Sequence, residues 1–242
     1  MTKYFTRKLP EKWTGAYNMN YKILPFEQMQ YAVNFPNHYI EGKKYPVILF
    51  LHGAGSRGND INKIINNPYF TEAAGKPDFP FISVVPQCHE NTWFDVFQTL
   101  KKLVCHVSCA EYTDPTRIYI MGVSMGGYAT WQLAMSMPEY FAAIVPMCGG
   151  GMAWNADRLK NVPVWAFHGA KDIWVLPEES ERMVEAVNKC GGNARLTIYP
   201  EAGHDAWTST YRTPEVFEWL LLQKNQNTLQ LKDIYKDNKI FG

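Results

Sequence analysis

Short apolar runs recur along the chain, and helical patterns separate most of them. Runs of strand length occupy residues 30–34, 45–51, 81–85, 117–121, 142–145, 164–167 and 195–199. Continuous apolar runs of about four to eight residues are typical of strands buried on both faces, as in a parallel sheet. These runs therefore predict a mostly parallel sheet rather than an antiparallel sheet with one wet face.

Helices are predicted at 94–109, 126–137, 177–190 and 214–223. Between Phe94 and Val107, apolar residues recur at spacings of three and four, which gives the first helix one apolar face. The third begins at Pro177 and ends before Gly191, the usual punctuation of a helix. Strand and helix alternate from about residue 45 to 224, which predicts one α/β domain.

Composition narrows the possible partners. The 242 residues are 46% hydrophobic with a net charge of +1, so disorder is excluded and no basic surface for nucleic acid or an anionic membrane is expected. No stretch approaches the roughly 20 apolar residues of a membrane span. The first residues lack the apolar core of a signal peptide, so we expect a cytoplasmic protein, with a processed secreted form as the alternative.

Five cysteines show no disulfide or zinc spacing. Cys105, His106 and Cys109 are close in sequence, but two further ligands at zinc spacing are missing. We therefore expect neither a metal nor another cofactor. Cys88 and Cys148 each follow a predicted strand, and we interpret them as buried structural thiols.

Gly122-Val-Ser-Met-Gly126 lies between a predicted strand and a predicted helix. In that context G-x-S-x-G forms a nucleophile elbow, a strained turn that exposes the serine hydroxyl. Side chains at Gly122 or Gly126 would collide with the neighbouring strand and helix. Ser124 is therefore the candidate nucleophile.

A nucleophilic serine needs a base and an orienting acid, which follow it along the chain in this architecture. Of the histidines after Ser124, His204 lies in a loop after the last strand, whereas His168 adjoins a strand and is expected to support the backbone. Asp172 lies between them and is favoured as the acid. Asp157 comes too early, and Asp205 is too close to His204 to reach its Nδ1.

Two backbone N–H groups are expected to bind the oxyanion of a tetrahedral intermediate. One belongs to Met125, the residue after the nucleophile. The other belongs to Ala54 in His52-Gly-Ala-Gly55, where flanking glycines let the backbone turn toward the site. His52 is expected to hold this loop by hydrogen bonding.

With these motifs in order, the chain resembles the α/β-hydrolase superfamily, in its dienelactone-hydrolase-like, feruloyl-esterase-like and prolyl-oligopeptidase-type branch. The resemblance is carried by 51–55, 85–88, 114–118, 122–128, 167–172 and 203–207. It implies a twisted sheet of about eight strands with helices on both faces and no large lid domain. It also implies extra strands within 1–44, a catalytic core over 45–224 and a C-terminal extension over 225–242, all in one domain.

The resemblance implies a serine esterase that cleaves carboxylic esters through an acyl-enzyme, with a Ser124, Asp172 and His204 triad. The expected partner is a small-molecule ester with a small or aromatic acyl group, such as a feruloyl or acetyl sugar ester. The sequence leaves the oligomeric state open. Trp93, Trp154, Trp174 and Trp207 follow predicted strands on the side where such folds bind ligands, which predicts an aromatic substrate cleft. The alternatives are a prolyl-oligopeptidase-type peptidase and a non-catalytic ligand-binding protein.

Overall fold

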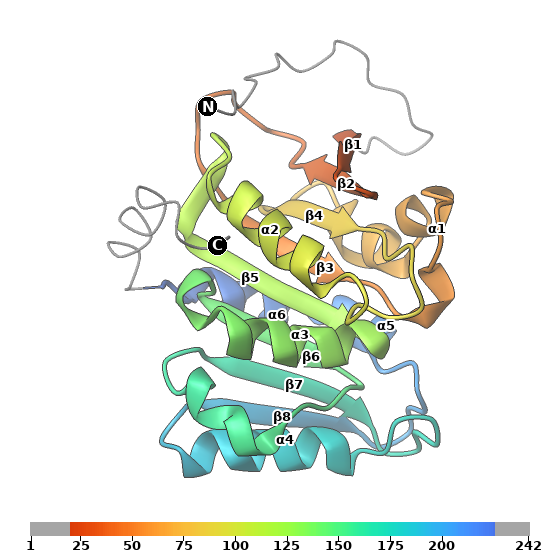
Figure 1. Cartoon of the computed structure of the whole chain (residues 1–242), viewed down its shortest axis with the longest axis vertical. Helices are drawn as coiled ribbons and strands as arrows, with labels where there is room; N and C mark the ends of the chain where they lie inside the picture. The colour runs from red at the N-terminus through yellow and green to blue at the C-terminus, as the bar shows by residue number, and fades with distance from the viewer. Residues whose placement is uncertain (1–19, 226–242) are drawn as a thin grey trace.

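The computed structural model describes residues 20–225, which form one mostly parallel sheet covered by helices on both faces (Figure 1). The strands are β1 Asn20–Phe26, β2 Met29–Phe35, β3 Tyr45–Leu51, β4 Ile82–Pro86, β5 Thr113–Val123, β6 Ala143–Met147, β7 Val164–Gly169 and β8 Ala194–Tyr199. The α-helices are α1 Asn62–Ile65, α2 Phe97–Ser108, α3 Met125–Ser136, α4 Glu178–Lys189, α5 Trp207–Tyr211 and α6 Pro214–Leu222. Shorter turns of helix are η1 Ala54–Ser56, the π-helical η2 Phe70–Ala74, η3 Pro138–Tyr140 and η4 Ala153–Leu159.

The strand order is β1-β2-β4-β3-β5-β6-β7-β8. β1 pairs with β2, and β2 with β4, in antiparallel register, while every pair from β4-β3 to β7-β8 is parallel. The carboxyl ends of β3 to β8 therefore meet at one edge of the sheet, where their loops can build a common site.

Two hydrophobic cores sandwich the sheet. Along β3, Val47, Leu49 and Leu51 face the core beneath α2, α3 and α4, whereas Ile48 and Phe50 face the core beneath η2, α5 and α6. Figure 1 shows α2, α3 and α4 in front of the sheet and α6 behind it. Because both faces are covered, β3 is fully buried, which explains its continuous apolar run.

The α/β class, the mostly parallel sheet and its eight strands are confirmed. Each predicted apolar run falls within or against an observed strand. β1 was not visible as an apolar run, because it is an edge strand with partly exposed side chains such as Ile23. The first predicted helix starts three residues later than expected, at Phe97, and the short α1 and α5 lacked a detectable period.

Only η4 and its flanking loops lie between β6 and β7, so the expected absence of a large inserted lid holds for the described residues at this position. Among residues 20–225, no helix has the length and apolarity needed to cross a membrane. Residues 1–19 of the predicted N-terminal segment lie outside the described residues. So do residues 226–242 of the predicted C-terminal extension. The proposed domain boundaries stay predictions.

Candidate active site

Ser124 lies in the sharp turn between β5 and α3. Its backbone has φ 54° and ψ −118°, a strained conformation for a residue with a side chain. The Ser124 N–H donates to the Met147 carbonyl at the end of β6, at 2.9 Å, which ties the turn to the neighbouring strand. The sequence GVSMG thus forms the strained strand–turn–helix unit expected of a nucleophile elbow.

The glycines of this turn are dictated by space. A Cβ on Gly126 would overlap the Leu51 carbonyl oxygen at the end of β3, and a Cβ on Gly122 would overlap the Gly126 carbonyl. Both obstacles are backbone atoms that cannot swing away. Close approach of α3 to the sheet therefore requires glycine at both positions.

A chain of hydrogen bonds connects the hydroxyl of Ser124 to a buried carboxylate. Ser124 Oγ lies 2.9 Å from His204 Nε2, and His204 Nδ1 lies 2.7 Å from Asp172 Oδ2. With Nδ1–H donating to the carboxylate, the neutral imidazole leaves Nε2 free to accept the serine proton. The structure thus brings His204 together with Asp172, 32 positions earlier in the chain, and with Ser124, 80 positions earlier.

Asp172 is held by further donors. Its Oδ1 accepts the backbone N–H groups of Trp174 at 2.9 Å and Val175 at 3.0 Å. Burial raises the pKa of Asp172, but the hydrogen bond from His204 and those from Val175 and Trp174 outweigh it, and the pKa lies below its ordinary value. The side chain is therefore a carboxylate near neutral pH.

The loop after β3 and the start of α3 both adjoin Ser124. Met125 is the first residue of α3 and Ala54 the first of η1, so neither N–H has an acceptor within its own helical turn. A Cβ on Gly53 would lie 3.5 Å from Ser124 Cβ, which places the loop after β3 directly against the nucleophile. This arrangement is suited to binding an anionic oxygen, with Ala54 and Met125 as the predicted donors.

His52 fixes that loop as predicted. It is fully buried, its Nδ1 lies 2.7 Å from the Gly53 carbonyl, and its Nε2 accepts the Cys88 N–H at 3.0 Å. Burial lowers the pKa of His52 to about 4, and the charge of Arg57 adds to this, so the ring is neutral near pH 7. A second clamp comes from Arg57, which donates to the Ala54 and Asn91 carbonyls.

Trp93 does not line a cleft as predicted. It has no exposed surface, and its Nε1–H donates to the His52 carbonyl at 3.0 Å. Its ring packs against the His52 ring with centroids 4.8 Å apart. The indole therefore supports the loop after β3 from inside the protein, where a substrate cannot reach it.

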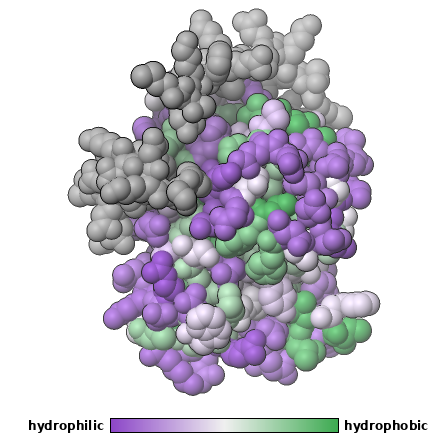
Figure 2. Space-filling view, in the orientation of Figure 1, coloured by the Kyte–Doolittle hydropathy of each residue, from purple (hydrophilic) through white to green (hydrophobic). Residues whose placement is uncertain are grey.

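The other three tryptophans lie near or on the surface. Trp154 and Trp174 are 81% and 80% exposed, and Trp207 packs edge-on against the ring of His204 at 5.2 Å. Ile173 and Leu176, beside Trp174, are also exposed. Figure 2 shows apolar side chains at the lower right, over the loops beyond the arrowheads of β7 and β8.

Sequence reasoning assigned Asp205 no catalytic role, and the structure gives it a local one. Its carboxylate accepts the N–H and hydroxyl of Thr208 in the first turn of α5, while the Nδ1 of His204 is hydrogen-bonded to Asp172. The predicted substrate role of Trp154, Trp174 and Trp207 stays a prediction.

Several known proteins with similar sequences or structures carry the names of hydrolases. A carboxymethylenebutenolidase-like protein of Salmonella typhimurium is 30% identical over 108 residues, which are 41% of this chain and 40% of that protein. Carboxylesterase SOBER1 of Arabidopsis thaliana is 24% identical over 190 residues, 65% of this chain and 82% of that protein. A solved thermostable esterase has a TM-score of 0.71 and 30% identity, covering 85% of this chain and 63% of the esterase.

The chain thus matches about 40% of the length of the bacterial carboxymethylenebutenolidase-like relatives. The esterase matches most of the described α/β domain, which identifies the fold as that of the α/β-hydrolases. The dienelactone hydrolase family matches residues 64–219, more than half of the chain and including Ser124, Asp172 and His204. This protein belongs to the dienelactone hydrolase family.

Proposed function

We propose that this protein is a serine hydrolase of carboxylic esters. The observation that carries the proposal is the continuous hydrogen-bonded chain from Ser124 Oγ through His204 to Asp172. Ser124 is the nucleophile, His204 the general base, and Asp172 the acid that orients the imidazole and stabilises its protonated form.

In the acylation step, Ser124 Oγ attacks the ester carbonyl carbon while its proton moves to His204 Nε2. The carbonyl oxygen becomes an oxyanion that accepts hydrogen bonds from the backbone N–H groups of Ala54 and Met125. The tetrahedral intermediate collapses with loss of the alcohol, which takes the proton from His204. Water, deprotonated by His204, then attacks the acyl-enzyme, and the acid leaves as Ser124 recovers its proton.

The preferred substrates are proposed to be small or aromatic acyl esters, with feruloyl and acetyl sugar esters as examples. Support comes from the exposed indoles of Trp154 and Trp174, which follow β6 and β7 at the edge that carries the triad. Flat indole faces stack on phenyl rings and on the apolar faces of sugars. The Salmonella relative's name adds an unsaturated lactone, carboxymethylenebutenolide, to the candidates worth testing.

The first experiment measures hydrolysis of p-nitrophenyl acetate by wild type and by Ser124→Ala. We expect the variant to lose several orders of magnitude in kcat. Ser209→Ala, which removes an exposed hydroxyl of α5, is the matched control and should keep wild-type rates. Equal rates in wild type and Ser124→Ala would refute the proposal.

The same enzyme is then given feruloyl, acetyl and butyryl esters, carboxymethylenebutenolide and short peptides. Peptide turnover above the ester rates would favour the prolyl-oligopeptidase-type alternative, because the same three residues can also cleave amides. A fluorophosphonate probe distinguishes the non-catalytic alternative. We expect labelling of Ser124, and wild type that resists the probe would favour a ligand-binding protein.

A further inference from the structure

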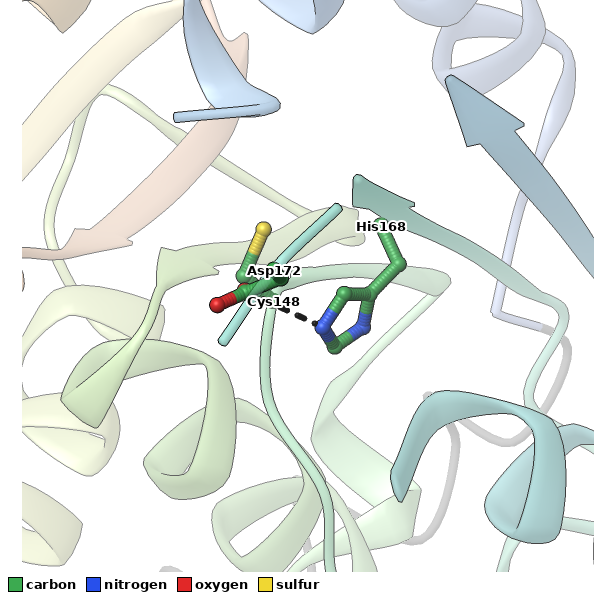
Figure 3. A group of neighbouring side chains, drawn as sticks. All are labelled: Cys148, His168 and Asp172. Atoms are coloured by element: carbon green, nitrogen blue, oxygen red, sulfur yellow. Dashed lines mark ion pairs between the residues drawn. The ribbon is translucent and has the colours of Figure 1, made fainter. Parts of the chain in front are cut away.

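A buried cluster of three side chains includes Asp172 of the triad (Figure 3). It consists of Cys148, which follows β6, His168 near the end of β7, and Asp172 in the loop after β7. All three side chains are buried, and one polar atom from each lies within 4.8 Å of the others. The ester-hydrolysis mechanism uses only Asp172 of this set.

His168 contacts both ends of the loop that carries Asp172. Its Nε2 lies 2.9 Å from the Val175 carbonyl oxygen and 3.3 Å from Asp172 Oδ2. A carbonyl oxygen can only accept a hydrogen bond, so the ring carries its proton on Nε2 and donates it to Val175, while Asp172 Oδ2 is a close polar neighbour. Oδ2 is also the oxygen that His204 Nδ1 approaches to 2.7 Å, so two imidazoles face the same carboxylate oxygen.

Val175 closes a small ring of contacts. Its carbonyl accepts from His168, and its N–H donates to Asp172 Oδ1 at 3.0 Å. The carboxylate is therefore held on one oxygen by Val175, which His168 itself fixes, and faces His168 directly on the other. Rotation of the carboxylate would break the backbone contact and move Oδ2 away from His204.

The opposite side of the His168 ring is anchored as well. Nδ1 lies 2.7 Å from Ser180 Oγ in the first turn of α4, so it accepts the Ser180 hydroxyl hydrogen, and Ser180 Oγ also lies 3.0 Å from the Gly149 carbonyl oxygen. Gly149 packs tightly on Gly127 of α3, since a Cβ on Gly149 would lie 2.7 Å from the Gly127 carbonyl carbon. The ring thus connects the Asp172 loop to α4 and, through the loop after β6, to the nucleophile helix.

The same three residues offer the ligand types of a metal site, and their bonding argues against that use. Both nitrogens of His168 and both oxygens of Asp172 already have hydrogen-bond or ion-pair partners. A cation on Asp172 Oδ2 would compete with His204 for the oxygen that orients it. Burial raises the pKa of the Cys148 thiol to about 12, so the sulfur carries its proton near pH 7.

We infer that His168 is a positioning residue for the triad: its Nε2–H holds the Val175 carbonyl, and the Val175 N–H in turn holds the Asp172 carboxylate in the orientation that His204 requires. This inference rests on the proposed function for its kinetic consequences and on the structure alone for its geometry. His168 has no exposed surface, so it acts on the reaction only through Asp172 and Val175. Misplacing a reacting group by about 1 Å costs on the order of 100-fold in rate, which sets the scale of the effect.

The kinetic test compares His168→Asn with His168→Gln. The amide of Asn reaches the position of Nδ1 but not that of Nε2, whereas the longer Gln can place an N–H donor near Nε2. With p-nitrophenyl acetate, His168→Asn should lower kcat about 10- to 100-fold with KM nearly unchanged. His168→Gln should recover most of the loss. Wild-type kcat in His168→Asn, or equal losses in both variants, would overturn the inference.

Proton NMR follows the His204 Nδ1–H shared with Asp172, which resonates far downfield in such pairs. We expect the signal to shift upfield in His168→Asn, to return in His168→Gln, and to be lost in Asp172→Asn. An unchanged signal in His168→Asn would overturn the inference. Circular dichroism shows whether each variant is folded.

A measurement on the unmutated protein covers the case in which the variants do not fold. With ¹⁵N-labelled histidine, the tautomer of His168 is read directly, and we expect a protonated Nε2. An unprotonated Nε2 would refute the inference without any substitution. Because this readout needs no substrate, a wild type that hydrolyses no ester refutes the proposed function and leaves the placement of Asp172 by His168 to be judged by NMR alone.

Discussion

Acid should destabilise this protein through one buried histidine, His52. Burial lowers its pKa from 6.5 to about 4 in the folded protein. As the pH falls below 6.5, the unfolded chain takes up a proton that the folded protein rejects, so unfolding becomes easier. The stabilisation is fully present above 6.5 and is lost as the pH falls toward 4. In the fold, a proton on Nε2 would also face the Cys88 N–H that this nitrogen now accepts.

The size of the effect follows from the shift. A difference of 2.5 between 6.5 and about 4, at 1.36 kcal/mol for each unit, gives about 3 kcal/mol in all. Of this, about 2.5 kcal/mol is lost between about pH 7.5 and about pH 4.5. Since a domain of this kind has only about 5–15 kcal/mol of stability, the loss is large enough to measure.

Urea unfolding at about pH 7.5 and about pH 4.5 measures how the free energy of unfolding changes with pH, in wild type and in His52→Gln. The Gln carbonyl can still accept the Cys88 N–H but does not titrate, so the variant should lose about 2.5 kcal/mol less stability across this range than wild type. Other groups, including His106 whose pKa burial also lowers, titrate in both proteins and cancel in the difference. Parallel pH dependence in the two proteins would refute the reasoning.

Two further predictions concern the turn and the rim of the site. Gly126→Ala should destabilise the fold by about 1–3 kcal/mol or more because its Cβ overlaps the Leu51 carbonyl, whereas Gly55→Ala, with open space around its Cβ, should leave the Tm nearly unchanged. Equal Tm values for the two variants would show that α3 can move away from β3. Trp174→Ala should raise KM for a feruloyl ester about 3- to 10-fold, because it removes one contact between aromatic rings. KM for an acetyl ester, whose acyl group has no ring, should stay unchanged. A matching rise for both esters in steady-state assays would count against a stacking role.

The fold was predictable where burial and local pattern agree. β3, β6 and β7 lie between helical layers, so their sequences are continuously apolar and their positions follow from hydropathy alone. β1 escaped the same reasoning because an edge strand needs only one well-packed side. Its position is fixed by antiparallel pairing with β2, which is a long-range contact and leaves little trace in β1 itself.

The three hydrogen-bonded residues were predictable from chain order, because the parallel sheet brings the loops after β5, β7 and β8 to one edge. The exposure of individual side chains could not be predicted from the sequence. Trp93 and Trp174 both follow strands, yet one is fully buried and the other 80% exposed. The difference is set by the partner that each loop finds: the indole N–H of Trp93 has the His52 carbonyl within reach, and such a buried acceptor cannot be recognised from the spacing of tryptophans.

The same limit applies to His168 and leads to a more general reading of the site. Its place beside a strand correctly predicted a supporting role, but the supported group depends on how the loop from Asp172 to Val175 turns back over the end of β7. That turn exists because the carboxylate draws in two backbone N–H groups of its own loop, so Asp172 shapes the segment that holds it. His52 does the same for the loop after β3, accepting a backbone N–H from across the sheet edge. In both loops a buried imidazole completes backbone hydrogen bonding, so the strained Ser124 turn lies between two loops that are each fixed by a histidine with no exposed surface.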